Sequence, residues 1–212
     1  GPGEIYDSNR YSLFGMLRKL DVDIIDLGVV RDKRELIEQA FREAAASADA
    51  VITSGGVSVG EADFVTETLD KLGTVSFWKI AMKPGRPVTF GHIDNAVFFG
   101  LPGNPVSVMV TFFQFVRPAL LRMAGGREIL DTYTLHARTT TALKKRPGRF
   151  EFQRGVLEQT GPGEFSVRSA GAQGSGILRS MSEANCFIML EPERTSVEAG
   201  EEVEVQPFQN LF

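Results

Sequence analysis

Between residues 7 and 123, hydrophobic residues alternate between helical and strand-like spacing. Apolar positions three or four residues apart predict helices over 11–20, 33–46, 61–72 and 105–123. Asp7, Ser8 or Asn9 can cap the first helix, and Asp32 with Glu35 resembles a capping box for the second. Short apolar runs predict strands over 21–30, 50–53, 75–80, 87–93 and 96–101. Strands separated by helices predict an α/β fold with a mostly parallel, three-layer sheet.

The pattern changes after the glycine pair at 125–126. Short alternating or β-branched runs follow, separated by Pro-Gly and Gly-Pro-Gly turns, over 132–141, 150–158, 165–169, 186–190 and 202–205. This pattern predicts a small β domain, either a barrel or a sandwich. We therefore expect two domains, 1–128 and 129–212.

The helix predicted over 105–123 is apolar on nearly every side, with Val108, Phe112, Phe113 and Val116 among its residues. A helix without a polar face packs in a core or against another subunit, and both interpretations stay open. The second would give a homodimer. No apolar run looks long and continuous enough to span a bilayer.

Composition limits the chemistry that the chain can carry. With 42% hydrophobic and 24% charged residues among 212, it can bury a real core. A net charge of -4 and a pI of about 5.4 argue against binding nucleic acid or a membrane, although a small cationic site remains compatible. One cysteine and two histidines exclude an internal disulfide and a zinc cluster, which favours a reducing, cytoplasmic setting. Because the chain begins Gly-Pro-Gly without methionine, we expect a tag remnant or a piece of a longer protein.

The segment 78–107 has the features of an anion site. Lys79, Lys83 and Arg86 fall on one short stretch that Pro84, Gly85 and Pro87 constrain. The following GLPGNPVS sequence, 100–107, is a strand-to-helix junction in which the helix N-terminus offers free N–H groups. A solvated charged edge and an ordinary capped helix start are the alternative interpretations.

A second candidate is the glycine-rich turn 53–60, followed by Asp63. Glycines allow backbone amides to converge on an anion, and Asp63 has the chemistry to hold a divalent metal beside a phosphate. A tight turn, with an acid in the first turn of a helix, explains the same residues without a ligand. Cys186 lies in an apolar strand pattern and is interpreted as packing.

Four motifs together are similar to one family. IYDSN at 5–9, TSGGVSVGEAD at 53–63, KIAMKPGRP at 79–87 and GLPGNPVS at 100–107 resemble the molybdopterin molybdenumtransferases of the MoeA type, which include the gephyrin E domains. Arg149, FQRG at 152–155, GSG at 174–176 and Ser180 extend the resemblance to the C-terminal part. It implies a MogA-like molybdopterin-binding domain followed by a small β-barrel domain.

The resemblance also implies roles for particular residues. Asp63, Lys79, Lys83 and Asp32 would be catalytic, with Asp63 beside Mg²⁺. The pterin nucleotide would contact polar or glycine-rich positions: Ser8, Asn9, Thr53, Ser54, Gly55, Gly56, Ser58, Gly60, Pro102, Gly103 and Asn104. Molybdate would be held by Arg86, Pro87, Ser107, Arg149 and Ser180. Arg86 differs from the lysine that is usual in this motif, which keeps the charge but changes the donor geometry.

The implied reaction inserts molybdate into adenylylated molybdopterin, molybdopterin-AMP, with release of AMP and with Mg²⁺ as cofactor. Lysine charges would neutralise the phosphate while the protein supplies positioning and electrostatics, without a covalent nucleophile. Members of the family carry further N-terminal domains, so the chain alone can be inactive. The alternatives are a MogA-type molybdopterin adenylyltransferase, a noncatalytic gephyrin-like scaffold, and a competence-damage-type nucleotide hydrolase. The predicted β domain argues against the first, and the KPGRP and GLPGNP pair against the last.

Overall fold

The computed structural model describes residues 7–55, 64–126 and 133–208. The chain separates into two compact units by their internal contacts. The α/β unit comprises Gly1–Ile80 and Gly85–Met123, and the β unit comprises Ala81–Pro84 and Ala124–Phe212. The short segment Ala81–Pro84 thus leaves the α/β unit in the middle of its sequence and packs with the β unit.

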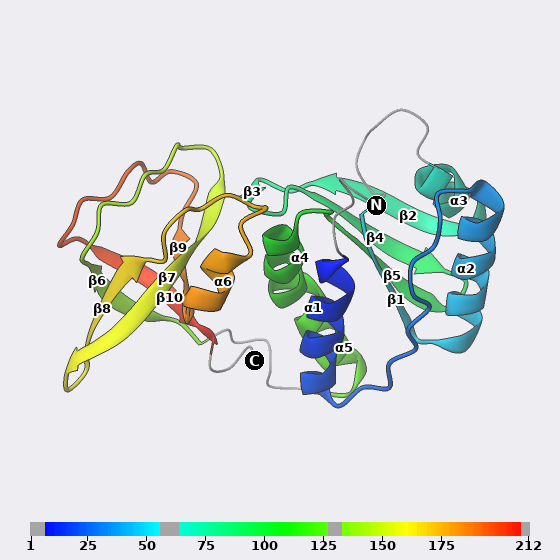
Figure 1. Ribbon diagram of the computed structural model, residues 1–212, viewed down its shortest axis with the longest axis horizontal. Helices are drawn as coiled ribbons and strands as arrows, with labels where there is room; N and C mark the ends of the chain where they lie inside the picture. The colour runs from blue at the N-terminus through cyan, green and yellow to red at the C-terminus, as the bar shows by residue number, and fades with distance from the viewer. Residues whose placement is uncertain (1–6, 56–63, 127–132, 209–212) are drawn as a thin grey trace. The chain divides into compact units, whose positions relative to one another are not determined.

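The α/β unit has three layers (Figure 1). Helices α2 and α3 cover one face of a four-stranded sheet, and α1, α4 and α5 lie on the other, which confirms the predicted architecture. Phe41, Leu69, Ile93 and Phe98 are buried between the sheet and the α2–α3 layer. The elements are α1 (Ser8–Leu17), η1 (Arg18–Leu20), α2 (Arg34–Ser47), β1 (Ala50–Ser54), α3 (Phe64–Leu72), β2 (Gly73–Lys79), β4 (Pro87–Ile93), β5 (Ala96–Leu101), α4 (Pro105–Thr111), the π-helical η2 (Phe112–Val116) and α5 (Arg117–Met123).

The sheet has the order β1-β5-β4-β2, and only β1 and β5 run parallel. The prediction of a mostly parallel sheet is therefore wrong for the described strands. Strands β4 and β5 are joined by the two-residue turn Asp94–Asn95, in which Asp94 has φ +50°. A connection this short can join only antiparallel neighbours. Strand β2 also pairs antiparallel, with β4.

The strand predicted over 21–30 does not form. Asp21 and Gly28 have φ of +53° and +73°, which interrupt an extended backbone. The Asp26 carboxylate accepts a hydrogen bond from the Gly28 N–H at 2.9 Å, a local turn that replaces a strand ladder. Ile25 and Val29 consequently stay exposed.

The predicted helix caps have three different outcomes. Asp7 caps α1 by accepting from the Arg10 N–H at 3.2 Å. Helix α2 begins after Lys33 without a side-chain cap, so the expected Asp32–Glu35 capping box does not form. Asn104 occupies the N-cap of α4 with Pro105 at the first helical position, although its side chain makes no capping hydrogen bond.

The long apolar helix is a core helix on one side. Val106, Val108 and Phe112 are fully buried, and α4 contacts α1 and β5. By length and composition Pro105–Met123 could cross a membrane, contrary to the expectation that no run is long enough, but half of its most apolar window is buried. Buried core helices meet the same criterion.

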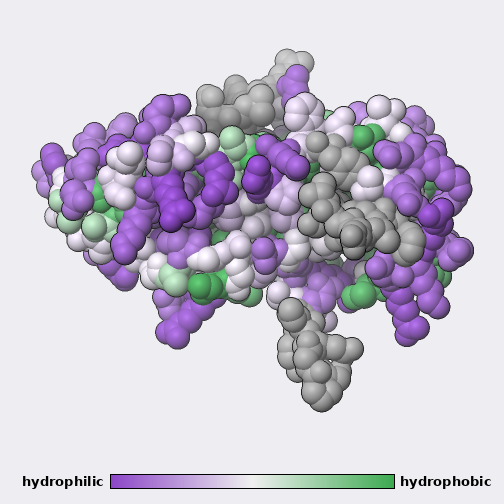
Figure 2. All heavy atoms as spheres, turned by 90° about the horizontal axis from the view of Figure 1, so that it is seen from above, coloured by the Kyte–Doolittle hydropathy of each residue, from purple (hydrophilic) through white to green (hydrophobic). Residues whose placement is uncertain are grey.

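On the face seen in Figure 2, hydrophilic side chains dominate and hydrophobic ones form small separate patches.

The β unit is a closed five-stranded barrel with one added strand. Pairing runs β7-β8-β6-β10-β9, and β9 closes the ring by pairing with β7. The short strand β3 pairs with the first two residues of β7. Closure removes the free edges that an open sheet would expose, and it decides between the predicted barrel and sandwich. The elements are β3 (Met82–Lys83), β6 (Leu135–Thr139), β7 (Phe150–Gly161), β8 (Glu164–Ser169), α6 (Arg179–Glu183), β9 (Cys186–Leu190) and β10 (Glu202–Pro207).

Gly155 is the position on β7 where the barrel interior leaves no room for a side chain. A Cβ there would lie 2.8 Å from Ile188 Cγ1 and 2.9 Å from both Cys186 Sγ and Val167 Cγ2. All three neighbours belong to the barrel core.

We predict opposite effects for two glycine-to-alanine changes. Gly155→Ala should lower the free energy of unfolding by about 1–3 kcal/mol, because the added methyl overpacks the barrel. Gly15→Ala is the control, at an exposed position of α1 where an added Cβ meets nothing within 4 Å. It should raise the free energy of unfolding by about 1 kcal/mol. Urea unfolding followed by circular dichroism and hydrogen exchange measures both. A Gly155→Ala variant as stable as wild type would contradict the packing argument.

Candidate functional site

Two predicted ligand-binding turns meet where the parallel strands end. The register pairs Thr53 with Gly100 and Ser54 with Leu101, so β1 and β5 finish at the same edge. The Gly55 N–H then donates to the Leu101 carbonyl at 3.1 Å, and Gly55 has φ +81°. Only glycine adopts this conformation readily, which explains its position directly after the strand. Carboxyl edges of parallel strands are where α/β folds place ligands.

The start of α1 joins the same edge through Asn9. Its Nδ2 donates to the Gly103 carbonyl at 2.7 Å, a contact spanning 94 positions of sequence. A Cβ on Gly103 would lie 3.8 Å from Gly55 Cα, so the two turns lie close together. Asn9 Oδ1 is buried and finds no hydrogen-bond partner among the described residues. The predicted residues Ser8, Asn9, Gly55 and Gly103 are therefore neighbours in the fold.

A cavity of about 670 Å³ opens beside β1. Thr53, Ser54, Gly55 and Asp32 line it, so four predicted site residues share one cavity. Its other walls come from α1, α2 and the irregular segment 24–30 and are largely apolar. A cavity that is apolar with a few polar groups suits a small organic ligand.

One ion pair fixes the wall of this cavity. Arg10 Nε donates to both oxygens of Asp26, at 2.9 and 3.0 Å. Hydrogen bonds from the Arg10 guanidinium and the Gly28 N–H hold the pKa of the Asp26 carboxyl below its usual range. Asp26 is therefore ionised near neutrality and its charge is paired with Arg10, so Asp26 adds little net charge to this wall.

Four predicted residues lie outside the described part of the chain: Gly56, Ser58, Gly60 and Asp63. Their roles, including the metal role of Asp63, stay predictions. Within residues 7–55, 64–126 and 133–208, no group of three or more His, Cys, Asp or Glu side chains is arranged to hold a metal ion.

The junction 100–107 has the predicted form. Pro102 is buried, Gly103 and Asn104 are exposed, and Ser107 lies in the first turn of α4 with only 4% of its surface exposed. The helix N-terminus carries free N–H groups, which favour an anion. The exposed peptides of Gly103 and Asn104 are the accessible part of this junction.

Lys79, Arg86 and Pro87 flank the segment Ala81–Pro84 that packs with the β unit. The register places Lys79 opposite Pro87, and the Ile80 N–H donates to the Arg86 carbonyl at 2.9 Å. Both cationic side chains are exposed. The backbone pairing therefore brings two predicted ligands together and leaves their charged groups accessible.

Lys83 and Arg149 belong to the β unit and lie at the same end of β7. Lys83 pairs with Glu151, and the Phe150 N–H donates to the Ala81 carbonyl at 2.9 Å. Arg149 directly precedes Phe150 and is exposed. The Lys83 amine lies 3.3 Å from the buried Glu151 carboxylate, a partner that sequence reasoning did not identify. The available sequence signal was Glu151 itself, a charged residue inside the strand predicted over 150–158.

Ser180 is less accessible than its predicted role requires. It is 2% exposed; its hydroxyl donates to the Ile177 carbonyl at 2.7 Å and accepts from Arg154 Nε at 3.1 Å. Arg154 is itself buried and donates to the carbonyls of Ala172 and Gly174. Burial lowers the pKa of Arg154 to about 10, which still leaves it charged near neutrality. Molybdate binding by Ser180 stays a prediction, and the described contacts give it a structural task.

Cys186 has the packing role that its strand pattern predicts. It is fully buried in the barrel core, and burial raises the pKa of its thiol to about 12. A thiol with this pKa is not a nucleophile near neutral pH.

Comparison with known proteins identifies the family. Residues 1–122 match the family of probable molybdopterin binding domains, and residues 136–208 match the MoeA C-terminal region, domain IV. The chain belongs to the molybdopterin-binding domain family. The resemblance stated from the four motifs is thereby confirmed, as is the predicted order of an α/β domain and a barrel.

Individual relatives in this family cover nearly the whole chain. A molybdopterin molybdenumtransferase from Haemophilus influenzae is 48% identical over 210 residues, 99% of this chain and 52% of the relative. Gephyrin from Dictyostelium discoideum is 33% identical over 93% of this chain and 32% of its own length. The crystal structure of a molybdopterin biosynthesis MoeA protein from Pyrococcus horikosii superposes with a TM-score of 0.79 at 32% identity, covering 99% of this chain and 50% of that one. The chain thus spans about half the length of these two molybdopterin relatives.

We predict that Asn9→Asp destabilises the contact between the start of α1 and the turn at Gly103. The substitution puts a carboxylate oxygen where Nδ2 now donates to the Gly103 carbonyl, so a hydrogen bond becomes a repulsion between acceptors. Unfolding free energy of the α/β unit should fall by about 1–3 kcal/mol. Fluorescence of Trp78, the single tryptophan, reports this unit during urea unfolding. Asn95→Asp, in the exposed β4–β5 turn, is the matched control, and equal effects of the two changes would contradict the assignment.

Proposed function

We propose that this chain is the substrate-binding half of a molybdopterin molybdenumtransferase. It binds adenylylated molybdopterin and molybdate, and molybdate is inserted with release of AMP. The observation that carries the proposal is the 48% identity, across 99% of the chain, to a protein named for this activity. The meeting of the turns at 53–55 and 102–104 supports it, because the exposed peptides of Gly103 and Asn104 lie at a carboxyl sheet edge, a position that suits a phosphate.

In this proposal the chain acts by positioning and electrostatics. The glycine turns of the α/β unit suit the phosphate of the nucleotide, and Lys79 of the same unit neutralises the charge that develops on it. The family motif assigns Lys83, which belongs to the β unit, to the same task. The guanidinium of Arg86 holds molybdate, for which a planar pair of donors is well suited. The single cysteine, Cys186, does not serve as a nucleophile, since its thiol is buried and protonated.

The Mg²⁺ part of the proposal rests on Asp63, which lies outside the described residues. When bound, the ion would neutralise the phosphate and polarise the bond to the leaving AMP. Asp63→Asn should then abolish the Mg²⁺ dependence of turnover in the full-length protein. Unchanged turnover and metal dependence would remove Asp63 from the proposal.

Calorimetric titration with adenylylated molybdopterin tests the substrate site. The chain should bind it saturably, and Lys83→Ala should weaken binding at least tenfold, because the ammonium-phosphate interaction is lost. A parallel titration with inorganic molybdate should show the same loss in Arg86→Ala. Lys19→Ala, an exposed lysine away from the predicted site residues, is the control.

Equal binding by Lys83→Ala and wild type would refute the lysine assignment. Absence of binding by wild type would leave the site to a longer chain, and the same titration on that chain would decide. AMP release in the longer chain separates the transferase from a noncatalytic, gephyrin-like scaffold.

We further propose that the protein acts as a homodimer in the cytoplasm. An acidic chain with one buried cysteine suits a reducing compartment. Exposed Trp78 and Phe90, on neighbouring strands β2 and β4, are apolar side chains that a second subunit could cover. Light scattering at micromolar concentration should give twice the chain mass of 23.2 kDa, and a mass of one chain would contradict the dimer.

A further inference from the structure

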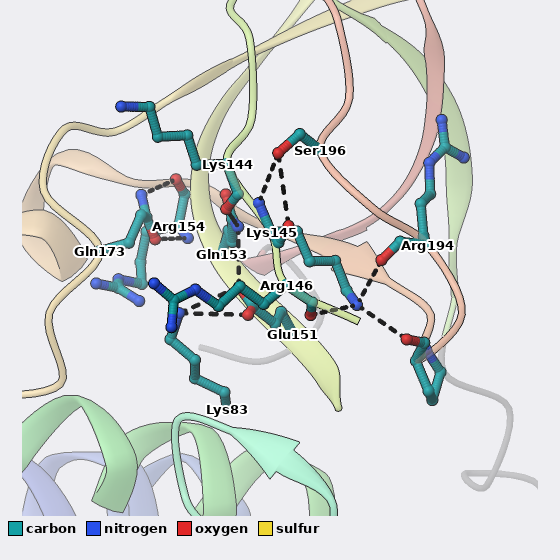
Figure 3. A network of polar contacts seen from close by, with 11 residues as sticks. Lys83, Lys144, Lys145, Arg146, Glu151, Gln153, Arg154, Gln173, Arg194 and Ser196 are labelled. Carbon is teal, nitrogen blue, oxygen red and sulfur yellow. Dashed lines mark hydrogen bonds and ion pairs between the residues drawn. The ribbon is translucent and has the colours of Figure 1, made fainter. Parts of the chain in front are cut away.

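The chain contains one described ion pair between a predicted ligand and a buried acid. Glu151 is 3% exposed at the start of β7, and the Lys83 amine donates to its two oxygens at 3.3 and 3.4 Å. Figure 3 shows Lys83 reaching from β3 to this carboxylate. Removing a carboxylate from water is costly unless it is paired and hydrogen-bonded, so the position of Glu151 depends on Lys83.

Glu151 is itself held in place by a second buried residue. Gln153 Nε2 donates to Glu151 Oε2 at 3.0 Å and to the Lys144 carbonyl at 2.9 Å, and Gln153 is 5% exposed. The register opposes Glu151 to Leu190 and Gln153 to Ile188, both in the barrel core. Residues directly opposite on paired strands point to the same face, so the carboxylate stands on the inner face at one end of the barrel. Its location is therefore fixed by the closed barrel.

Lys83 keeps part of its amine available, unlike the buried Lys145. Lys145 is 6% exposed, and its three ammonium protons go to the carbonyls of Arg146, Pro192 and Arg194. The Lys83 side chain is 44% exposed, and among the described residues its amine contacts a single carboxylate. An ammonium group has three donors, so Lys83 can hold Glu151 and still donate to an anion from solvent.

We propose that Glu151 is a positioning residue for the Lys83 amine, holding this flexible side chain in the place from which it contacts the nucleotide phosphate. The inference rests on the proposed function. A lysine loses considerable rotamer freedom when it binds a ligand, and an amine held beforehand loses less. Because β3 is a strand of only two residues paired to β7, the same ion pair also ties Lys83 to the rigid barrel.

The opposite effect is physically possible, because a carboxylate also reduces the positive charge that Lys83 presents. Glu151→Gln separates the two effects, since the amide keeps the shape of the side chain and removes its charge. Positioning predicts that this change weakens binding of adenylylated molybdopterin about tenfold. Tighter binding would show neutralisation and would overturn the proposal.

A double-mutant cycle distinguishes positioning from general damage to the barrel. Glu151→Gln should cost about tenfold in affinity with Lys83 present and less than about twofold in a Lys83→Met background. Equal losses in both backgrounds would mean a structural role and would overturn the proposal. Glu158→Gln, an exposed acid on the same strand, is the control, and melting temperatures confirm that each variant folds.

A readout without ligand keeps the inference separate from the proposed function. Relaxation of the lysine Nζ and Cε resonances in the free chain should show Lys83 more ordered than exposed Lys79. Glu151→Gln should make the two equally mobile. If neither this chain nor the longer chain binds the nucleotide, the proposed function fails, whereas unchanged Lys83 order in the variant independently overturns the role of Glu151.

Discussion

The parallel pairing of β1 with β5 is the constraint on which the candidate site depends. Both strands run in one direction and end opposite each other, so the turns that follow them, at 53–55 and 102–104, must emerge at the same edge. Phe98, Phe99 and Leu101 are buried along β5. Successive residues of a strand point to opposite faces, so Phe98 and Phe99 pack against different layers, and a slip of one residue would exchange them. Burial of β5 therefore fixes the position of the two glycine turns.

The barrel imposes a second constraint, through closure. Because β7 pairs with β8 on one side and with β9 on the other, its course is determined along much of its length. The short strand β3 takes its place from β7, and Lys83 takes its place from β3. A cation that the sequence puts beside Lys79 thus belongs to a different packing unit. The packing of the β unit therefore decides where Lys83, one of the predicted ligand-binding residues, lies.

Buried polar groups in the β unit show two ways of satisfying charge. Arg154 and Lys145 donate to carbonyl and hydroxyl acceptors, and none of their hydrogen bonds within the described part of the chain goes to an acid. Glu151 is paired with a lysine that remains partly exposed. In the first arrangement, hydrogen bonds from a buried cation hold loops against strands. The second leaves donors free, so that a structural ion pair and a ligand can share one ammonium group.

The sequence by itself determined the two-domain order, most strand and helix positions, and the family. Hydrophobic period and turn residues are local signals, and the bounds predicted for 87–93, 96–101 and 186–190 coincide with β4, β5 and β9. Local signals failed where a strand needed a neighbour. The run 21–30 has strand-like composition, but the turn at Asp26 and Gly28 and two left-handed residues replace its ladder.

Strand direction, barrel closure and the partners of charged residues were decided only by the tertiary structure. The motifs predicted that Lys83 is a ligand, yet nothing in their spacing predicted its contact with Glu151, 68 residues away. The same holds for Asn9 with Gly103 and for Arg154 with Ser180. Such contacts depend on which strands pair and in which register, and these follow from burial across the whole unit. A sequence pattern records that a residue is charged, whereas the packed structure decides what lies opposite that charge.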